Sequence, residues 1–258
     1  MLDTITSTKN PLVARFKSLR TKRGREEAGV FLVEGEKMIK EALEAGLLPR
    51  EALIEKPLAP EIIKELEKMG AKIYPVQRHV LEACCDTMTP SGACCSFSPP
   101  KPLDQGNPPK FLIALDGLQD PGNAGTIWRT ADAAGFEGMI FGEGCADALA
   151  PKVVRGTMGS AFRIPVAQVE CLADALHAFR ESGYEIVVTS LLGEDIYRRG
   201  PLGGKFVLVI GSEAHGVSEA VNALATVRLK LPMRGGAESL NAAVAAGIIM
   251  YELTREMA

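Results

Sequence analysis

The sequence predicts an α/β protein with two domains, and three observations support this prediction. Short apolar runs that suit buried strands alternate with amphipathic segments that suit helices along most of the chain. The 258 residues, of which 47% are hydrophobic and 24% charged, are enough for two ordinary cores. Residues 98–110 contain five prolines and almost nothing to bury, which is typical of a linker. We therefore expect one domain at 1–97 and a second at 111–258.

The first of these domains has the pattern of a small α/β domain. Its expected strands are short runs rich in β-branched or aromatic residues, and its expected helices have apolar residues three or four positions apart. The strands are expected at 30–33, 51–55 and 72–76, and the helices at 35–46, 60–70 and 79–86.

The second domain has apolar runs separated by helical segments, which predicts a parallel sheet with helices on both faces. The strands are expected at 111–116, 138–142, 164–166, 185–190, 205–210 and 227–231, and the helices at 123–135, 151–158, 171–182, 217–224 and 239–256. Asn123 is a favourable cap residue, and we expect the first of these helices to begin there.

Composition narrows the functional classes. The net charge of −3 and the isoelectric point near 5.8 are not typical of a nucleic-acid-binding protein, although local basic clusters matter more than the total. No apolar run approaches the ~20 residues that span a bilayer. The N-terminal residues lack the apolar core of a signal peptide, so we expect a cytoplasmic protein.

Six cysteines include two adjacent pairs, Cys84-Cys85 and Cys94-Cys95. Zinc ligands usually stand two to four residues apart, and neighbouring cysteines cannot easily face one ion. The chain has only three histidines. We therefore expect small, partly buried thiols and no metal site.

Three loops that follow predicted strands carry glycines and polar side chains. They are 117–129, 211–217 and 232–241. An open α/β sheet binds its ligand at the carboxyl ends of its strands, so we expect these loops to form one site. None of them has the Gly-x-Gly-x-x-Gly spacing of a dinucleotide site, and the chain lacks the P-loop motif.

Together these loops resemble the three motifs of the SpoU/TrmH group of SPOUT RNA 2′-O-ribose methyltransferases. The first motif is matched by Asn123, Gly125 and Arg129, the second by Gly211-Ser212-Glu213 and Gly216, and the third by Pro232 with Ser239-Leu240-Asn241. The resemblance implies methyl transfer from S-adenosylmethionine to a ribose 2′-hydroxyl in RNA, with ribosomal RNA favoured over transfer RNA. It also implies a C-terminal SPOUT domain with a trefoil knot, and a homodimer.

The resemblance implies a catalytic set that consists of Arg129, Asn123, Glu213, Ser239 and Asn241. A guanidinium is effectively never deprotonated in proteins, so Arg129 is not expected to be a base. We expect it to hold the phosphate beside the target ribose and to stabilise the developing alkoxide. Asn123 combines capping with orientation of the substrate or of Arg129. Glu213 could fix Arg129 or a ribose hydroxyl, or act as a base, whereas His215 is not expected to be the base.

The adenosyl group requires apolar walls and backbone hydrogen bonds more than charged side chains. The expected cofactor contacts are Leu191, Ile210, Gly211, Gly216, Leu231, Met233 and Leu240. For Leu231 and Leu240, ordinary core packing explains an apolar residue equally well.

The first 25 residues are basic, with Asp3 as their single acid. Such a segment either contacts phosphates, with strong salt dependence, or forms a solvated helix face. Asn10, Leu19, Arg23 and 31–35 resemble the substrate-binding domain that precedes many SpoU-type catalytic domains, which favours RNA contact. The expected RNA-binding residues are Lys9, Arg15, Arg20, Lys22 and Arg23; Lys152 and Arg155 either extend this surface or are simply solvated.

Two other functional classes compete with this interpretation. A non-catalytic RNA-binding protein could retain the same fold, but a decayed site tends to lose polar residues such as Arg129 and Asn241. A dehydrogenase is disfavoured because the chain lacks the glycine fingerprint and a suitably placed ribose-binding acid. Binding of S-adenosylmethionine, but not of NAD, separates the leading interpretation from the dehydrogenase.

Overall fold

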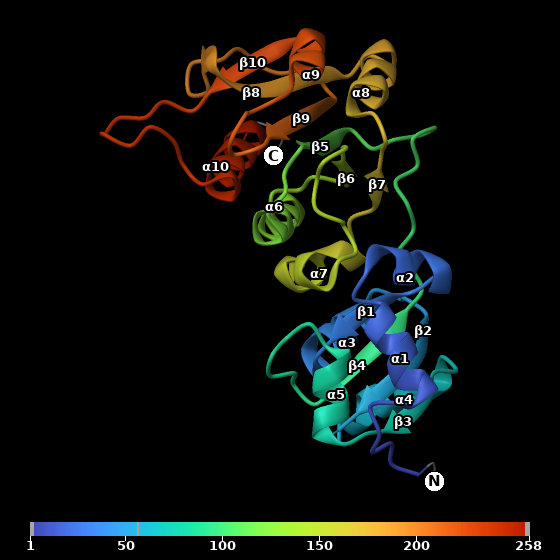
Figure 1. Cartoon of the computed structure of the whole chain (residues 1–258). Helices are drawn as coiled ribbons and strands as arrows, with labels where there is room; N and C mark the ends of the chain where they lie inside the picture. Colours follow the sequence, from blue (N-terminus) through green and yellow to red (C-terminus); the bar gives the residue numbers. More distant parts are fainter. Residues whose placement is uncertain (1–2, 56, 256–258) are drawn as a thin grey trace. The chain divides into compact units, whose positions relative to one another are not determined.

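The computed structural model describes residues 3–55 and 57–255, and the chain forms two compact units (Figure 1). The first unit comprises the chain up to Pro100 together with Leu149–Arg163. The second comprises Lys101–Ala148 together with the chain from Ile164 onwards. The segment Leu149–Arg163 therefore packs with the N-terminal residues, although its neighbours on both sides in the sequence belong to the second unit.

The first unit is built on a four-stranded mixed sheet in the order β1-β4-β2-β3. Its strands are β1 (Phe31–Glu34), β2 (Pro49–Ile54), β3 (Lys72–Pro75) and β4 (Ala93–Phe97). β4 runs antiparallel to both of its neighbours, and all five of its residues are buried. The sequence does not predict β4, because Ala-Cys-Cys-Ser-Phe contains no β-branched residue.

Helices surround this sheet, two of them in the basic N-terminal segment. The helices are α1 (Pro11–Ser18), α2 (Lys22–Ala28), α3 (Glu36–Glu44), α4 (Pro60–Lys68), α5 (Arg78–Cys84) and α7 (Pro151–Thr157), and a short 3₁₀ helix, η1, covers Ser160–Phe162. α1 begins after Asn10, whose side chain accepts the N–H of Leu12, and it buries Leu12, Val13 and Phe16. One face of the basic segment is therefore part of the core.

Four of the six thiols lie in the core of this unit, at Cys84, Cys85, Cys94 and Cys95. Burial raises the pKa of Cys84 to about 12 and raises the pKa values of Cys94 and Cys95 well above the ordinary thiol value. Cys145, in the second unit, is half-buried, and burial raises its pKa as well.

These raised pKa values lead to a prediction about thiol reactivity. A thiol must lose its proton and be accessible to act as a nucleophile, so at pH 8 the raised pKa values of Cys84, Cys94 and Cys95, together with the burial of both cysteine pairs, should keep these pairs inert. We expect 5,5′-dithiobis(2-nitrobenzoate) to react with Cys171 first and Cys145 slowly in the folded protein, and with all six after addition of guanidinium. The Cys171→Ser variant should lose the fast phase. Rapid reaction of more than two thiols in the folded protein would contradict the burial of the two cysteine pairs.

The second unit is built on a parallel sheet, which confirms the predicted fold class. Within the described residues it has six strands in the order β10-β8-β9-β5-β6-β7, all paired in parallel. The strands are β5 (Phe111–Asp116), β6 (Gly138–Phe141), β7 (Val166–Gln168), β8 (Glu185–Asp195), β9 (Phe206–Gly211) and β10 (Val227–Lys230). β6 and β7 lie on one side of β5, and β9, β8 and β10 lie on the other, so the chain order reverses between β5 and β9.

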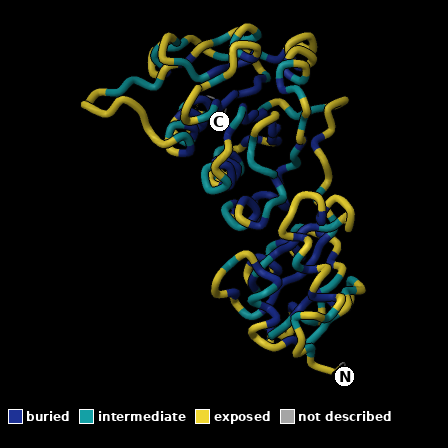
Figure 2. Tube along the Cα trace, viewed as in Figure 1, coloured by how far each residue is buried: buried dark blue, intermediate teal, exposed yellow. Residues whose placement is uncertain are grey.

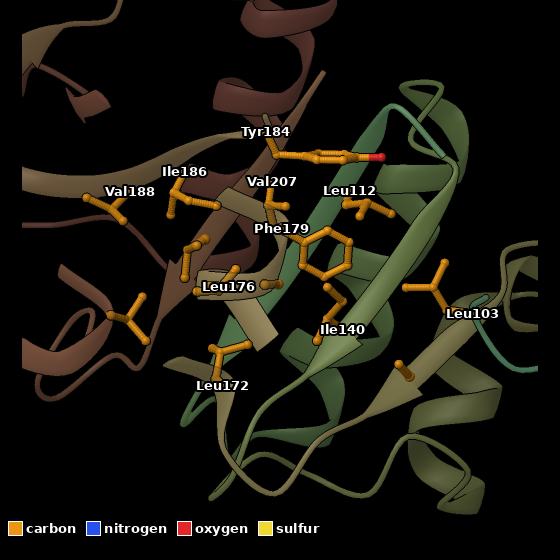
Figure 3. Close-up of a cluster of buried hydrophobic side chains, with 14 residues drawn as sticks. Leu103, Leu112, Ile140, Leu172, Leu176, Phe179, Tyr184, Ile186, Val188 and Val207 are labelled. Atoms are coloured by element: carbon orange, nitrogen blue, oxygen red, sulfur yellow. The ribbon is translucent and has the colours of Figure 1, made fainter. Parts of the chain in front are cut away.

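The helices of this unit are α6 (Pro121–Ala133), α8 (Leu172–Glu181), α9 (Glu219–Leu224) and α10 (Ala242–Thr254). Figure 3 shows Leu176 and Phe179 of α8 among side chains of the sheet, including Ile140 and Val207. The ring of Phe179 meets that of Tyr184 edge-on, with centroids 5.3 Å apart. In Figure 2 the central strands of each unit are buried, among them β4 and β9, while many of the connecting loops are exposed.

The proline-rich segment packs onto this second unit. Leu103 is buried in the core, and its N–H donates to the carbonyl of Val166 at 3.1 Å. The hydroxyl of Tyr184 donates to the carbonyls of Pro108 and Pro109 at 2.9 and 3.0 Å. These contacts fix residues 103–109 to the second unit, whereas the N–H of Ser98 donates to the carbonyl of Leu48 within the first unit.

The expected boundaries of the C-terminal helix differ slightly from those observed. The helix was expected over 239–256, whereas α10 begins at Ala242, after Asn241, and ends at Thr254; residue 256 lies outside the described residues. No helix in the described part of the chain is both long and apolar enough to cross a membrane.

Candidate functional site

The first candidate loop follows β5 and leads into α6. The prediction that Asn123 begins this helix is wrong: Asp120 is the cap, and its carboxylate accepts the N–H of Asn123 at 2.7 Å. Pro121 occupies the first helical position, where the missing N–H costs nothing and the fixed φ suits the helix. The side chain of Asn123 therefore does not cap the helix and makes contacts outside it.

Those contacts join all three candidate loops. The Asn123 amide nitrogen donates to Glu213 Oε1 at 2.5 Å, and the Asn241 amide nitrogen donates to Asn123 Oδ1 at 2.9 Å. Asn241 caps α10, and its own Oδ1 accepts the N–H groups of Ala243 and Val244 at 3.0 and 3.2 Å. Because backbone N–H groups can only donate, they fix the orientation of the Asn241 amide. That orientation in turn places the Asn123 nitrogen toward the carboxylate, so a directed chain of hydrogen bonds ends on Glu213.

The order of the strands explains why these loops meet. β5 and β9 are neighbours, with Asp116 opposite Gly211 at their carboxyl ends. The loops that follow them therefore start side by side at the point where the chain order reverses, which is where open α/β sheets bind their ligands. α10 packs against α6, which brings its cap residue Asn241 to the start of α6.

Asp116 is a site residue that sequence reasoning missed. Its side chain is almost fully buried, and Oδ2 accepts the N–H of Ser218 at 2.7 Å. This hydrogen bond ties the end of β5 to the loop after β9. A carboxylate at the end of a buried apolar run is a signal that could have identified it, because a buried charge needs compensating partners.

The loop after β9 is a tight turn that requires glycine. Ser212 and Gly216 exchange backbone hydrogen bonds of 3.0 and 2.9 Å, and Gly216 has a φ of +67°. A Cβ atom at Gly211 would lie 2.1 Å from the carbonyl carbon of Gly216 and 2.3 Å from the nitrogen of Val217. Residue 211 therefore has no room for a side chain, because backbone atoms cannot move aside cheaply.

Arg129 lies on the exposed face of α6, while the adjacent Trp128 points into the core against Phe141. Within the described residues the Arg129 guanidinium makes no ion pair, and Glu213 is hydrogen-bonded to Asn123 instead. Arg129 is thus presented to solvent near the loops, where an anionic ligand can reach it. His215 is exposed, and its backbone N–H donates to Ser212 Oγ at 3.1 Å.

The residues expected to contact a cofactor lie in, or in loops after, three neighbouring strands, β9, β8 and β10. Ile210 and Gly211 end β9 and are buried, Leu231 and Met233 are half-buried, and Gly216 is exposed. Leu191 and Leu240 are exposed apolar side chains, with 75% and 39% of their surfaces accessible.

Because Leu240 is exposed, it does not fill the core. Of the two roles considered for it, core packing is therefore disfavoured relative to contact with the cofactor. Leu192, which the sequence did not indicate, is 94% exposed beside Leu191. Ser239 is exposed two residues before the α10 cap. Exposed apolar side chains suit a ligand that has an apolar face, such as an adenosyl group.

The basic N-terminal residues have acidic neighbours in the folded unit. Arg15 pairs with Glu51 at 2.5 Å, Arg20 approaches Asp86 at 3.9 Å, and Lys22 and Arg23 pair with Glu26 and Glu27 one helical turn away. Lys9 is exposed. Exposed ion pairs of this kind are weak, typically under about 1 kcal/mol, so a phosphate can replace the carboxylate at little cost.

The described residues contain no group of three or more His, Cys, Asp or Glu side chains arranged to hold a metal ion. Lys152 is exposed, whereas the Arg155 side chain is engaged with the carboxylates of Glu34 and Asp86.

Comparison with known proteins gives matches over both units. A model of the SpoU rRNA Methylase family matches residues 110–251, and a model of the MRM3-like substrate binding domain matches residues 10–95. The 23S rRNA (guanosine(2553)-2′-O)-methyltransferase RlmP of Bacillus subtilis is 35% identical over 251 residues, which cover 96% of this chain and 98% of that protein.

Two solved structures are similar over nearly the whole chain. The AdoMet-bound rRNA methyltransferase from Sinorhizobium meliloti has a TM-score of 0.90 at 30% identity and covers 99% of this chain and 98% of its own. The SpoU methyltransferase AviRb from Streptomyces viridochromogenes, in complex with AdoMet, has a TM-score of 0.84 at 30% identity and covers 96% and 98% of the two chains.

Proposed function

Since the chain belongs to the SpoU rRNA methylase family, we propose that it transfers a methyl group from S-adenosylmethionine to a ribose 2′-hydroxyl in RNA, with ribosomal RNA as its substrate. The observation that carries this proposal is the hydrogen-bonded chain Asn241–Asn123–Glu213, in which each of the three motif loops contributes one polar side chain. The preference for ribosomal RNA is supported by the relative from Bacillus subtilis, which is named for a 23S rRNA substrate.

S-adenosylmethionine is the cofactor, as the AdoMet-bound structures of similar proteins indicate. When bound, it supplies an electrophilic methyl group on a positively charged sulfur. Ile210 and Gly211 offer backbone groups at the end of β9, and Leu191, Leu231, Met233 and Leu240 offer apolar contacts. The residues present therefore fit an adenosyl group.

In the proposed reaction the side chains of this protein position the ribose and stabilise charge. Arg129 holds the phosphate next to the target ribose through its guanidinium fork and stabilises the negative charge that develops on the 2′-oxygen. Glu213 Oε1 is occupied by Asn123. In the proposed reaction its other oxygen accepts a hydrogen bond from the ribose hydroxyl, and the hydroxyl proton passes to a phosphate oxygen or to water as the methyl group moves from sulfur to the 2′-oxygen. Holding both reactants in line can supply ~7–11 kcal/mol of the barrier reduction.

Ser239 lies in the loop before α10 and adds a hydroxyl that can hydrogen-bond to the substrate or the cofactor. We also propose that the C-terminal segment of the chain threads a loop to form a trefoil knot. This proposal rests on the family resemblance.

The protein is further proposed to act as a homodimer. Val244, Ile248 and Tyr251 of α10 stand at positions i, i+4 and i+7 and are 53%, 37% and 56% exposed. Apolar side chains at this spacing form one stripe along the helix, which a second copy of the chain can cover. Arg129 lies on the exposed face of α6, the helix against which α10 packs, so this arrangement places it close to a dimer interface.

The roles of Asn241 in capping and in the site can be separated by one substitution. In Asn241→Asp the carboxylate still accepts the N–H groups of Ala243 and Val244, but the donor to Asn123 is lost. We expect the free energy of unfolding to change by less than about 0.5 kcal/mol and kcat to fall roughly tenfold, because the lost hydrogen bond is to a group that acts in the transition state. Denaturant unfolding and initial rates of methyl transfer measure the two effects.

The Asn241→Ala variant is the matched control, since it removes the cap as well and should lose about 1 kcal/mol of stability. If Asn241→Asp kept the rate of the unmodified protein, the hydrogen-bonded chain would have no part in the reaction.

The proposed function itself is tested by transfer of labelled methyl from S-adenosylmethionine to unmodified ribosomal and transfer RNA. We expect label in ribosomal RNA, and a lower kcat/KM for transfer RNA. Preferential labelling of transfer RNA would overturn the choice of substrate. Saturable cofactor binding without label in either RNA would favour the non-catalytic RNA-binding protein.

A further inference from the structure

The segment Leu149–Arg163 connects β6 to β7 in the sheet of the second unit, yet it packs within the first unit. The chain therefore passes from one unit to the other at three places: after Pro100, before Leu149 and after Arg163. The segment contains α7 and η1, and α7 lies against β1 of the first unit.

Arg155 of α7 is the first anchor of this segment. Its Nη2 lies 3.1 Å from Asp86 Oδ2, and its Nη1 lies 3.6 Å from Glu34 Oε2. The Glu34 side chain is 5% exposed, and its carboxylate also accepts hydrogen bonds from the backbone of Asp86 at 2.6 Å and from the Thr87 hydroxyl at 2.8 Å. Glu34 is thus held in place by the first unit, and Arg155 binds to a rigid acidic partner.

The other end of the segment has a second set of contacts. Arg163 Nη1 lies 3.0 Å from Glu41 Oε2 of α3, and the ring of Phe162 lies 6.1 Å from that of Phe31. The turn between the anchors passes through Met158, with a φ of +50°, and Gly159, with a φ of +99°. A left-handed conformation at a non-glycine residue costs energy and persists where surrounding contacts enforce it.

We propose that Arg155 is a positioning residue for the methyl transfer, an inference that rests on the proposed function. RNA bound by the first unit must reach a methyl donor held by loops of the second unit. Arg155 fixes the segment 149–163, both ends of which join the second unit. The loss of Arg155 therefore loosens this connection without removing a group that contacts the RNA or the methyl donor. Because Arg155 is engaged with two carboxylates, this role is favoured over direct contact with RNA. A misplacement of about 1 Å can cost roughly 100-fold in rate.

The test compares Arg155→Ala and Arg155→Lys with the matched control Arg78→Ala, which removes an exposed arginine–glutamate pair within α5 of the same unit. For each variant we would measure hydrogen exchange of residues 149–163, the Kd for S-adenosylmethionine, and kcat and KM for ribosomal RNA. Asp86→Asn removes the charge of one of the two carboxylates that hold Arg155, and this variant replaces Arg155→Ala in the test if Arg155→Ala does not fold.

For Arg155→Ala we expect faster exchange confined to 149–163, a cofactor Kd within twofold of the original, and kcat/KM for RNA lowered roughly tenfold or more. Arg155→Lys should recover part of the loss because it keeps the charge, and Arg78→Ala should change nothing. Unchanged exchange in Arg155→Ala, or faster exchange with unchanged kcat/KM, would overturn the inference. If the unmodified protein methylated no RNA, the proposed function would fail, whereas exchange would still report whether Arg155 anchors the segment.

Discussion

Replacing Arg129 by alanine is expected to lower kcat for methyl transfer by roughly 10²- to 10³-fold while the affinity for S-adenosylmethionine stays unchanged. Arg129 is exposed on α6 and makes no ion pair within the described residues, so its removal leaves no buried charge and costs little stability. In the proposed reaction it stabilises charge that appears only as the 2′-oxygen attacks. A group of this kind affects the rate more than the binding of the cofactor.

Two further variants make this result specific. Arg129→Lys keeps the positive charge but loses the planar fork, so we expect it to recover less than a tenth of the lost rate. Arg180→Ala removes an exposed arginine from α8 of the same unit and should retain full activity. Single-turnover rates with saturating RNA measure these effects, and a rate within threefold of the original for Arg129→Ala would contradict the assigned role.

The second large effect is expected for Gly211→Ala, which should weaken binding of S-adenosylmethionine by roughly 10- to 100-fold. The new Cβ would lie 2.1 Å from the carbonyl carbon of Gly216 and 2.3 Å from the nitrogen of Val217, so the turn after β9 must open. Forcing an extra methyl group into a packed site typically costs about 1–3 kcal/mol. Every 1.4 kcal/mol taken from binding corresponds to a factor of about ten in Kd.

Gly204→Ala is the matched control, because a Cβ atom there meets nothing within 4 Å, the backbone is not in the left-handed region, and the residue precedes β9 at the end opposite to Gly211. Isothermal titration calorimetry with S-adenosylmethionine measures the change, and circular dichroism shows whether the sheet is retained. A Kd for Gly211→Ala within threefold of the original would show that the turn does not form part of the cofactor site.

Much of the fold follows from local patterns. The strands of the parallel sheet are predicted well because strands buried on both faces leave continuous apolar runs, such as 111–116 and 206–211. β4 escapes prediction because its small residues and cysteines have weak strand preference, and its place in the sheet depends on pairing with β1 and β2. The start of α6 was misplaced because Asp120-Pro121 is a stronger start signal than Asn123.

The candidate site was predictable at the level of loops, but its hydrogen bonds were not. Loops at the carboxyl ends of strands are expected to meet, yet only the strand order places β5 beside β9 and so Asn123 beside Glu213. The partner of Asn241 likewise depends on how α10 packs on α6. The packing of 149–163 with the first unit depends on contacts between residues far apart in the sequence, such as Phe162 with Phe31 and Arg163 with Glu41, which no local pattern contains.

The position of the transferred methyl group tests the central claim most directly. Alkali cleaves RNA only where a free 2′-hydroxyl can attack the neighbouring phosphate, so a 2′-O-methylated nucleotide survives as a dinucleotide. After incubation of the protein with labelled S-adenosylmethionine and unmodified ribosomal RNA, we expect the label in alkali-resistant dinucleotides, and no such label with Arg129→Ala. Label in mononucleotides would show methylation of a base and would contradict the proposed reaction.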